Sequence, residues 1–398
     1  MAKNIVLCAD GTGNTFSTNV SNVVRLVRSL RLDDCATQVV FYDQGVGTAR
    51  GDVAKAKRFA DEGRRQALRI LPAPNTPWML HPWLTRQLGR GFGFGLAENI
   101  AEMYGALARC YTEGDRLYLF GFSRGAFTVR ALAGLLYRCG LLQPQDLDRF
   151  GQAYTLYAPH YQHIRTLAAL ERLKAEVSSF RDRHGVRSCG VHFLGLWDTV
   201  KSYGFIVPKS LPHLRHNPAV KTVRHALALD ERRCYFQATS WGGVDDPSYD
   251  DAHPDDSPDV REVWFAGCHA DVGGGYDAGE SGLARPPFAW MVNEARRFGL
   301  EFDDRELDGI LREFPAESVA HESLTGAWWP VELLPRMELE NVPVPGTRVV
   351  KWGSSGRRHL SQFSRGGAAA VHSSARDFHA ARDISLPSDR AVVIVHEP

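Results

Sequence analysis

The sequence has no apolar run that approaches the ~18 residues of a membrane-spanning helix, so it does not predict an integral membrane protein. It has only seven cysteines, an odd number, and no two of them have Cys-x-x-Cys spacing. Cys8 and Cys268 lie in apolar, strand-like runs, which indicates small core residues of a reduced compartment and neither a disulfide framework nor a zinc site. The formal net charge is only +1, which gives no electrostatic reason to expect nucleic acid as a partner.

Targeting and repeat signals are missing as well. The N-terminus turns polar too early for the apolar segment of a signal peptide, so we expect synthesis in the cytoplasm. There is neither an internal repeat nor a low-complexity tract. What is present is a chain of 398 residues with 44% hydrophobic and 23% charged residues, a composition typical of a soluble globular protein with ample core material.

Short apolar runs alternate with stretches of helical periodicity along most of the chain. We expect strands over Asn4–Ala9, Gln38–Tyr42, Leu117–Phe120, Gly190–Leu196, Cys234–Trp241 and Arg261–Gly267, with an edge strand at Ala391–Val395. Helical spacing is found over Val20–Leu32, Leu96–Tyr111, Phe127 to about Gly140, and Phe288–Phe298. Strands and helices in alternation favour a parallel sheet with right-handed crossovers.

The predicted core domain covers residues 1–300, and three segments interrupt its alternation. Residues 49–90 join a basic helical piece to a loop rich in proline and tryptophan, residues 143–187 are helical and amphipathic, and residues 201–233 are rich in histidine and basic residues. We interpret all three as insertions, with the helical ones forming a cap. Residues 301–398 have a weaker pattern and are expected to pack on the core as a C-terminal extension.

The most informative stretch changes from strand to helix period at residues 116–136. Between the strand and the helix lies Gly-Phe-Ser-Arg-Gly, residues 121–125, a G-x-S-x-G pattern in the strand–turn–helix context of a nucleophile elbow. Such a turn projects the serine hydroxyl, here that of Ser123, at the carboxyl end of the strand. Gly121 and Gly125 lie where side chains would collide with the strand and the helix. An ordinary strand-to-helix turn is the alternative interpretation.

Backbone donors for an oxyanion can be sought in two places. The N–H of Arg124, at the start of the helix, faces the predicted site and can help to hold an oxyanion. The Gly-rich loop after the first strand could supply the second donor, from Gly11 or Thr12. A plain turn into the next helix explains the same loop equally well.

A nucleophilic serine needs a base, and the base needs a group that fixes its tautomer. Asp198 and His269 each follow a later predicted strand, so the order Ser123, Asp198, His269 is that of α/β-hydrolases. All three would lie at the carboxyl edge of the sheet, where open α/β sheets bind ligands. Asp271 and Asp277 are alternative acids, and Asp198 could instead be a helix cap.

Several motifs follow one another in the order found in a known family. They are Asp10–Asn14, Gly93–Leu96 with Asn99 and Ile100, Gly114–Asp115, Phe120–Gly134, Leu196–Val200 and His269–Tyr276. Through them the chain, from about Asn4 to Leu300, resembles the α/β-hydrolase domain family of type VI secretion phospholipase effectors. The resemblance implies an α/β-hydrolase-like, doubly wound, mostly parallel sheet with a nucleophile at Ser123 and a base at His269.

The resemblance also implies activity on ester bonds, which in the known effectors belong to phospholipids. The expected partner is therefore an ester or lipid substrate, with neither metal nor another cofactor, and export would use a signal-peptide-independent secretion system. An aromatic and apolar patch at 328–334 has two interpretations, core contact and transient contact with a membrane surface. The sequence identifies no protein partner.

Two other functions fit the same residues. One is a metal-dependent phosphoesterase with ligands at the same edge of the sheet, namely Asp10, Asp198, His269 and Asp271. Asp10 and Asp271 have a further interpretation, as side chains that hold loops by accepting backbone N–H bonds. The other function is a non-catalytic binding module. We favour a serine ester hydrolase of the lipase or phospholipase type that forms an acyl-enzyme on Ser123.

Overall fold

The computed structural model describes most of the N-terminal three hundred residues and several shorter stretches of the remainder. The described residues are 2–11, 20–45, 67–71, 93–158, 167–200, 211–241, 258–326, 329–332, 336–339, 348–351, 358, 360, 368–387 and 391–396. The predicted insertion at 49–90 lies outside them, except for residues 67–71.

The described residues form one main sheet of nine strands in the order β11-β10-β7-β6-β5-β4-β1-β2-β3, and every neighbouring pair in it is parallel. The strands are β1 (Asn4–Ala9), β2 (Gln38–Asp43), β3 (Leu68–Ile70), β4 (Arg116–Phe122), β5 (Val191–Trp197), β6 (Thr222–Ala228), β7 (Asp259–Phe265), β10 (Ala369–His372) and β11 (Val392–Val395). The chain first adds β2 and β3 on one side of β1 and then returns to add β4 on the other side. This reversal makes the carboxyl ends of β1 and β4 the topological switch point, where doubly wound sheets place their sites.

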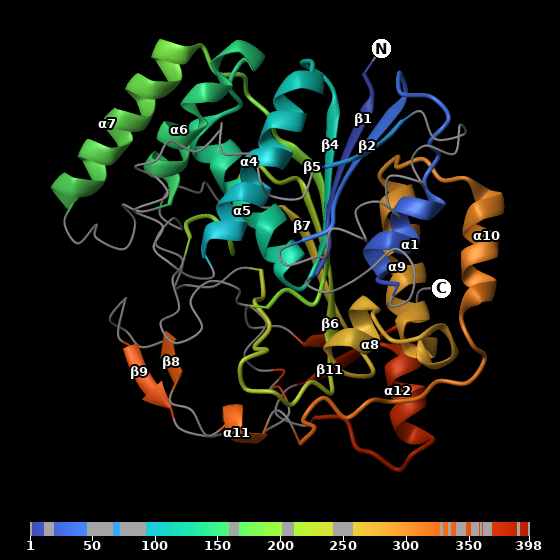
Figure 1. Cartoon of the computed structure of the whole chain (residues 1–398). Coiled ribbons are helices and arrows are strands. Elements are labelled where there is room, and N and C mark those ends of the chain that lie inside the picture. The colour runs from blue at the N-terminus through green and yellow to red at the C-terminus, as the bar shows by residue number, and fades with distance from the viewer. Residues whose placement is uncertain are drawn as a thin grey trace.

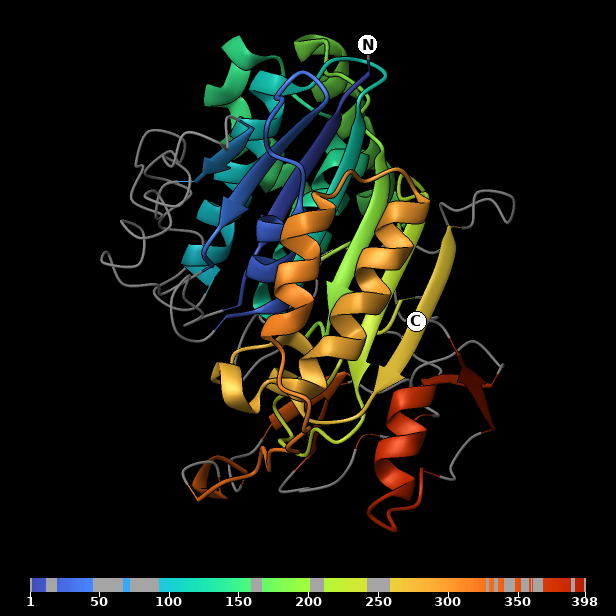
Figure 2. The same cartoon turned by 90° about the vertical axis from the view of Figure 1, so that its right-hand side faces the viewer.

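Helices cover both faces of the sheet, as Figures 1 and 2 show, so the predicted α/β doubly wound fold is confirmed. One face carries α4 (Gly93–Cys110), α5 (Arg124–Cys139), α6 (Phe150–Tyr157) and α7 (Leu167–His184). The other face carries α1 (Asn22–Ser29), α9 (Arg285–Arg297) and α10 (Asp304–Glu313). Helices α6 and α7 come from the predicted insertion at 143–187 and pack against α5.

Several shorter helices and one antiparallel strand pair lie outside this main framework. They are the 3-10 helices Pro144–Arg149, Ala278–Glu280 and Gly282–Ala284, the helices α8 (His269–Gly273), α11 (Trp329–Glu332) and α12 (Ser373–Ala380), and the antiparallel pair β8 (Arg336–Leu339) and β9 (Arg348–Lys351). In the part of the chain that is described, no helix combines the length and the apolar character that crossing a membrane requires.

The central strands are buried on both faces, which explains their continuous apolar runs. In β1, Ile5 and Leu7 join the hydrophobic core under α4 and α5, while Val6 and Cys8 join the core under α1 and α9. Cys8 and Cys268 are free and fully buried, as expected for small core residues. The sheet is therefore a rigid support between two hydrophobic layers, with its loops at the edges.

One strand lies where the sequence analysis expected an insertion. β6 falls within residues 201–233, and the strand predicted over Cys234–Trp241 is wrong, since that stretch is irregular. The cause is that β6 carries Arg224 and His225, which break its apolar pattern. Arg224 pairs with Asp259 and Glu294, and His225 Nδ1 lies 2.9 Å from Glu262. The folded protein therefore supplies partners for polar side chains that, in the sequence, suggest an exposed segment.

The C-terminal segment is part of this sheet. β10 and β11 lengthen it beyond β7, and the predicted edge strand at Ala391–Val395 appears as β11. Two strands of the segment 301–398, β10 and β11, thus extend the core sheet itself. Of the apolar patch at 328–334, Trp329 is half exposed, while Trp328 and residues 333–334 lie outside the described residues.

Candidate active site

Ser123 occupies the single-residue turn between β4 and α5. Its backbone has φ +57° and ψ −121°, a conformation that residues with a side chain seldom adopt. Asp198, the first residue after β5, also has a positive φ, of +38°. Among the described residues only four non-glycine residues have positive φ, and these are two of them. Such strain persists where surrounding structure enforces it, and it concentrates at functional sites.

The elbow depends on close backbone approach at both of its glycines. A Cβ on Gly121 would lie 2.6 Å from the backbone N and Cα of Ala126, and a Cβ on Gly125 would lie 2.1 Å from the carbonyl oxygen of Ala9. The absence of both side chains lets α5 begin directly against β4 and β1. The collisions expected from the G-x-S-x-G pattern are therefore present on both sides of the serine.

We expect Gly125→Ala to lower the free energy of unfolding by about 1–3 kcal/mol, because the new methyl group would overlap the Ala9 carbonyl. Gly309→Ala in the exposed middle of α10 is the matched control. Nothing lies within 4 Å of a Cβ at that position, so alanine there should raise stability by up to about 1 kcal/mol. Urea unfolding of the two variants measures the difference, and equal midpoints would contradict the close approach at Gly125.

The structure brings Ser123, His269 and Asp198 together at the carboxyl ends of β4, β7 and β5. His269 Nε2 lies 2.8 Å from Ser123 Oγ, and His269 Nδ1 lies 2.6 Å from Asp198 Oδ2. The three residues are 8%, 5% and 0% exposed, respectively, so their hydrogen bonds are sheltered from water. This geometry can pass a proton from the serine hydroxyl to the imidazole.

Asp198 is held as an ionised acceptor. Its carboxylate receives four donors: His269 Nδ1, the backbone N–H of Ala228 at 3.0 Å, and both Nη atoms of Arg358, at 2.5 and 3.0 Å. Burial by itself would raise the pKa of Asp198, but the Arg358 guanidinium and the hydrogen bond from His269 bring it well below its usual value. Because an ionised carboxylate only accepts, His269 carries its proton on Nδ1 and leaves Nε2 free to accept from Ser123.

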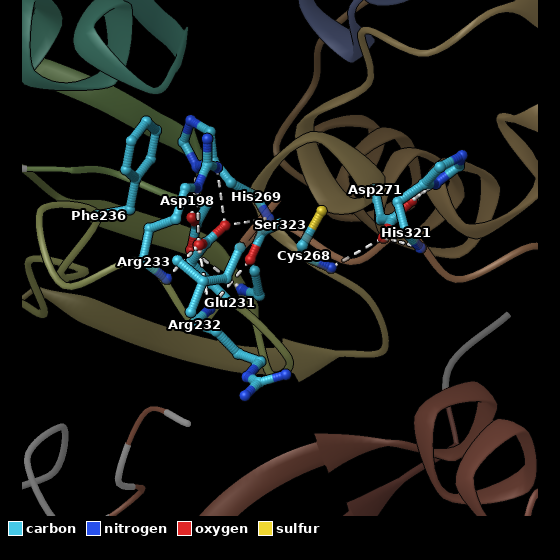
Figure 3. A network of polar contacts seen from close by, with 12 residues as sticks. Asp198, Glu231, Arg232, Arg233, Phe236, Cys268, His269, Asp271, His321 and Ser323 are labelled. Atoms are coloured by element: carbon cyan, nitrogen blue, oxygen red, sulfur yellow. Dashed lines mark hydrogen bonds and ion pairs between the residues drawn. The ribbon is translucent and has the colours of Figure 1, made fainter. Parts of the chain in front are cut away.

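Aromatic rings and a second ion pair fix the imidazole. The ring of His269 lies 4.7 Å from that of Phe122 and 5.1 Å from that of Phe236, measured between centroids. Its backbone N–H donates to Glu231 at 3.1 Å, and Glu231 is in turn paired with Arg233. Figure 3 shows Glu231 between His269 and the arginine side chains. The histidine is therefore restrained through both its ring and its backbone.

The alternative acids lie elsewhere. Asp271 accepts from His321 Nδ1 at 2.6 Å and from the backbone N–H of Cys268 at 2.9 Å, where it closes the first turn of α8. Figure 3 shows this pair apart from the pair that Asp198 makes with His269. Asp277 is exposed and precedes a 3-10 helix. The geometry thus favours Asp198 as the partner of His269.

The structure describes two of the three residues expected to supply oxyanion donors, Arg124 and Gly11. Arg124 is the first residue of α5, so its N–H has no partner inside the helix. The N–H of Gly11 donates to the carboxylate of Asp10 at 2.7 Å, which turns it to another acceptor. Thr12 lies outside the described residues. Arg124 is therefore the better-supported donor.

The carboxylates of the proposed metal site are already engaged. Asp10 accepts from Gly11, from the Ser21 hydroxyl at 2.5 Å and from the Tyr42 hydroxyl at 2.9 Å. Asp198 and Asp271 have the partners described above. Among the residues that the structure describes, no three histidine, cysteine or acidic side chains are grouped as metal ligands would be. Asp10 and Asp271 each accept a backbone N–H bond, from Gly11 and Cys268, which agrees with their other interpretation as side chains that hold loops.

Sequence reasoning missed two residues of this site. Arg358 lies 160 positions after Asp198, in a segment with little periodicity, and no spacing rule connects the two. Glu231 follows β6, the strand whose charged residues concealed it. Recognition of β6 would have placed Glu231 at the carboxyl edge of the sheet beside the other candidates.

Comparison with known proteins gives one family and several relatives. The family described as "T6SS, Phospholipase effector Tle1-like, catalytic domain" matches residues 3–294. The uncharacterized protein YEL023C of Saccharomyces cerevisiae is 32% identical over 244 residues, which cover 59% of this chain and 32% of that protein. This chain therefore spans about a third of the length of its yeast relative.

Two solved structures are similar to this chain, at lower sequence identity than the yeast relative. A crystal structure of an uncharacterized protein from Pseudomonas aeruginosa has a TM-score of 0.43 and 19% identity, over 79% of this chain and 49% of that one. The structure of the Tle1 effector bound to the VgrG spike from the type 6 secretion system has a TM-score of 0.30 and 18% identity, over 71% of this chain and 53% of that one. Likeness at this level supports no argument about mechanism.

The family match covers the part of the chain that contains the candidate site. It begins at the first strand, continues through β4, β5 and β7 and ends within α9, so it takes in Ser123, Asp198 and His269. Because it covers well over half of the chain, this protein belongs to the family of Tle1-like phospholipase effector catalytic domains of type VI secretion.

Proposed function

We propose that the protein is a serine ester hydrolase of the lipase or phospholipase type that forms an acyl-enzyme on Ser123. The observation that carries the proposal is the chain of hydrogen bonds from Ser123 Oγ to His269 Nε2, at 2.8 Å, and from His269 Nδ1 to Asp198, at 2.6 Å. It occurs at a strained elbow on the switch point of a doubly wound sheet. The description of the family, as phospholipase effector domains, agrees with this chemistry.

In the first half of the reaction His269 Nε2 takes the hydroxyl proton of Ser123 as the oxygen attacks the ester carbonyl. The carbonyl π electrons move to oxygen, and the resulting oxyanion accepts a bond from the N–H of Arg124. Asp198 stabilises the imidazolium without taking its proton. When the tetrahedral intermediate collapses, the C–O bond to the alcohol breaks, and His269 returns the proton to the leaving oxygen.

The second half repeats these steps with water. His269 removes a proton from a water molecule, whose oxygen attacks the acyl carbon. Collapse of the second intermediate releases the carboxylic acid and restores the hydroxyl of Ser123. No step requires a metal ion, and the carboxylate of Asp198 has four donors already, which leaves it poorly suited to a ligand role.

The substrate and the place of action follow from the family as proposals. We infer a lipid ester substrate, phospholipid in particular, since that is the class named in the family description. Export by a signal-peptide-independent route fits the same description. Transient contact with the membrane surface would bring such a substrate to the carboxyl edge of the sheet.

A fluorophosphonate probe tests the proposal directly. We expect the purified protein to be labelled covalently on Ser123 and to lose its ester hydrolase activity in proportion. The Ser123→Ala variant should take up no label, and EDTA should leave the hydrolysis of a phospholipid in mixed micelles unchanged. Activity that resists the probe and disappears with EDTA would favour the metal-dependent phosphoesterase, whereas a folded protein with neither activity nor labelling would favour the binding module.

A further inference from the structure

A buried arginine from the C-terminal segment lies directly behind the candidate acid. Arg358 Nη1 is 2.5 Å from Asp198 Oδ1, and its Nη2 is 3.0 Å from Oδ2, so the pair is bidentate. Arg358 is 8% exposed, and Asp198 is completely buried. The same guanidinium also donates to the backbone carbonyls of Ala228 and Phe236. Four such bonds fix its position and make the arginine an integral part of the site.

The consequences pass through Asp198 to the histidine. An isolated buried carboxylate tends to take up a proton, and a protonated Asp198 would be free to donate to the imidazole instead of accepting from it. The guanidinium removes that tendency by placing a fixed positive charge against both carboxylate oxygens. Asp198 then accepts the Nδ1 proton of His269, which is the tautomer that serine attack requires.

We propose that Arg358 is a positioning residue of the active site, which keeps Asp198 ionised and oriented so that His269 presents its free lone pair to Ser123. The proposal rests on the serine hydrolase function proposed above. Arg358 does not contact Ser123 or His269 directly. It acts through the acid, and it also holds the backbone of Phe236, whose ring lies against His269. It also lies outside residues 3–294, so the segment that follows the family match supplies a part of the site.

Arg358 also affects the pH range of the reaction. Two other pairs of ionisable groups lie near Asp198 and His269 among the described residues. Glu231 is paired with the cation Arg233. His225 is paired with Glu262, but burial lowers the pKa of His225 and favours its neutral form, so this second pair is not charge-balanced. Arg358 is the cation that contacts the acid directly. The positive charge of Arg358 repels an additional proton on the Asp198–His269 pair, so protonation of the pair is less favourable than it would be without the arginine. We therefore expect the activity to be lost at higher pH on the acid side when Arg358 is removed.

The test is the pH dependence of kcat and KM for hydrolysis of p-nitrophenyl butyrate by Arg358→Met, with Arg358→Lys and Arg376→Met beside it. For Arg358→Met we expect kcat to fall on the order of 10–100-fold, KM to change little, and the acid limb of kcat/KM to move to higher pH. The conservative Arg358→Lys should restore the wild-type position of that limb. Within the described residues, Arg376 pairs with its exposed neighbour Asp377 and contacts no residue of the site, so its variant should match the wild type.

A second comparison separates positioning from a loss of folding. In an Asp198→Asn background the same Arg358→Met change should lower kcat by much less, because the group through which it acts is gone. This double variant also has no uncompensated buried charge, so it should fold where Arg358→Met alone does not. A folded Arg358→Met with an unshifted acid limb, or an equal loss of kcat in both backgrounds, would overturn the proposal.

One readout does not depend on turnover, so failure of the proposed function can be distinguished from failure of this inference. The proton between His269 Nδ1 and Asp198 should give a low-field ¹H resonance that is missing in His269→Gln. We expect this resonance to titrate at higher pH in Arg358→Met than in the wild type. An unchanged titration would refute the role of Arg358, whereas absence of esterase activity and of serine labelling in the wild type would refute the function.

Discussion

Replacement of Ser123 by alanine is expected to lower the turnover of ester substrates on the order of a million-fold, to the background rate, while the protein stays folded. The loss is this large because the hydroxyl oxygen is the proposed nucleophile, and no other hydroxyl is described within reach of His269 Nε2. Stability should change little, since alanine keeps the backbone N–H that Ser123 donates to Trp197 at 3.1 Å.

The measurement is the hydrolysis rate of purified wild type and variant on a phospholipid in mixed micelles, together with their thermal unfolding. Thr128→Ala serves as a matched control, because the Thr128 hydroxyl donates to the helix carbonyl of Arg124 at 3.0 Å and to no other group among the described residues. Near-normal turnover by the folded Ser123→Ala variant would refute the acyl-enzyme mechanism.

Replacement of Asp198 by asparagine is expected to lower kcat by about 10⁴-fold, with KM nearly unchanged. The amide has nearly the same shape as the carboxylate. It can donate toward His269 Nδ1, however, and thereby favour the tautomer in which Nε2 carries the proton and cannot accept from Ser123. The effect should be smaller than that of Ser123→Ala, since the nucleophile and the base are still present.

Asp271→Asn is the matched control for this change. Asp271 is also buried and also lies 2.6 Å from a histidine Nδ1, that of His321, but this pair does not contact Ser123. We expect kcat of its folded fraction to equal that of the wild type. A larger loss of kcat in Asp271→Asn than in Asp198→Asn would show that the acid has been assigned to the wrong residue.

Several parts of this architecture could be predicted because local rules decide them. The buried strands on either side of the switch point have continuous apolar runs, and Ser123, Asp198 and His269 each follow such a run. Since the carboxyl ends of parallel strands meet at one edge, position in the chain was enough to bring the three residues into one neighbourhood. The glycines of the elbow followed from the geometry of the turn.

Other parts depend on contacts that no local pattern records. The strand β6 was not recognised in the sequence because it contains Arg224. The charge of Arg224 is matched by Glu294 on α9, 70 positions away. Arg358 was hidden in the same way, because its partner is remote and its own segment lacks periodicity. Buried charges are the common cause: each is stable only with a partner that tertiary structure supplies, so its sequence neighbourhood resembles a surface.

The ion pair between Asp198 and Arg358 also has a consequence for synthesis. The two residues leave the ribosome 160 positions apart, which at ~5–20 residues per second corresponds to roughly 10–30 s. During that interval the serine, the histidine and the acid can all have been translated while the acid still lacks its counter-ion. If the chain is the lipid ester hydrolase proposed above, it becomes fully active only late in its synthesis, after most of the sheet has been made. The lipids of the producing cell would then be exposed to active nascent chains for only a short time.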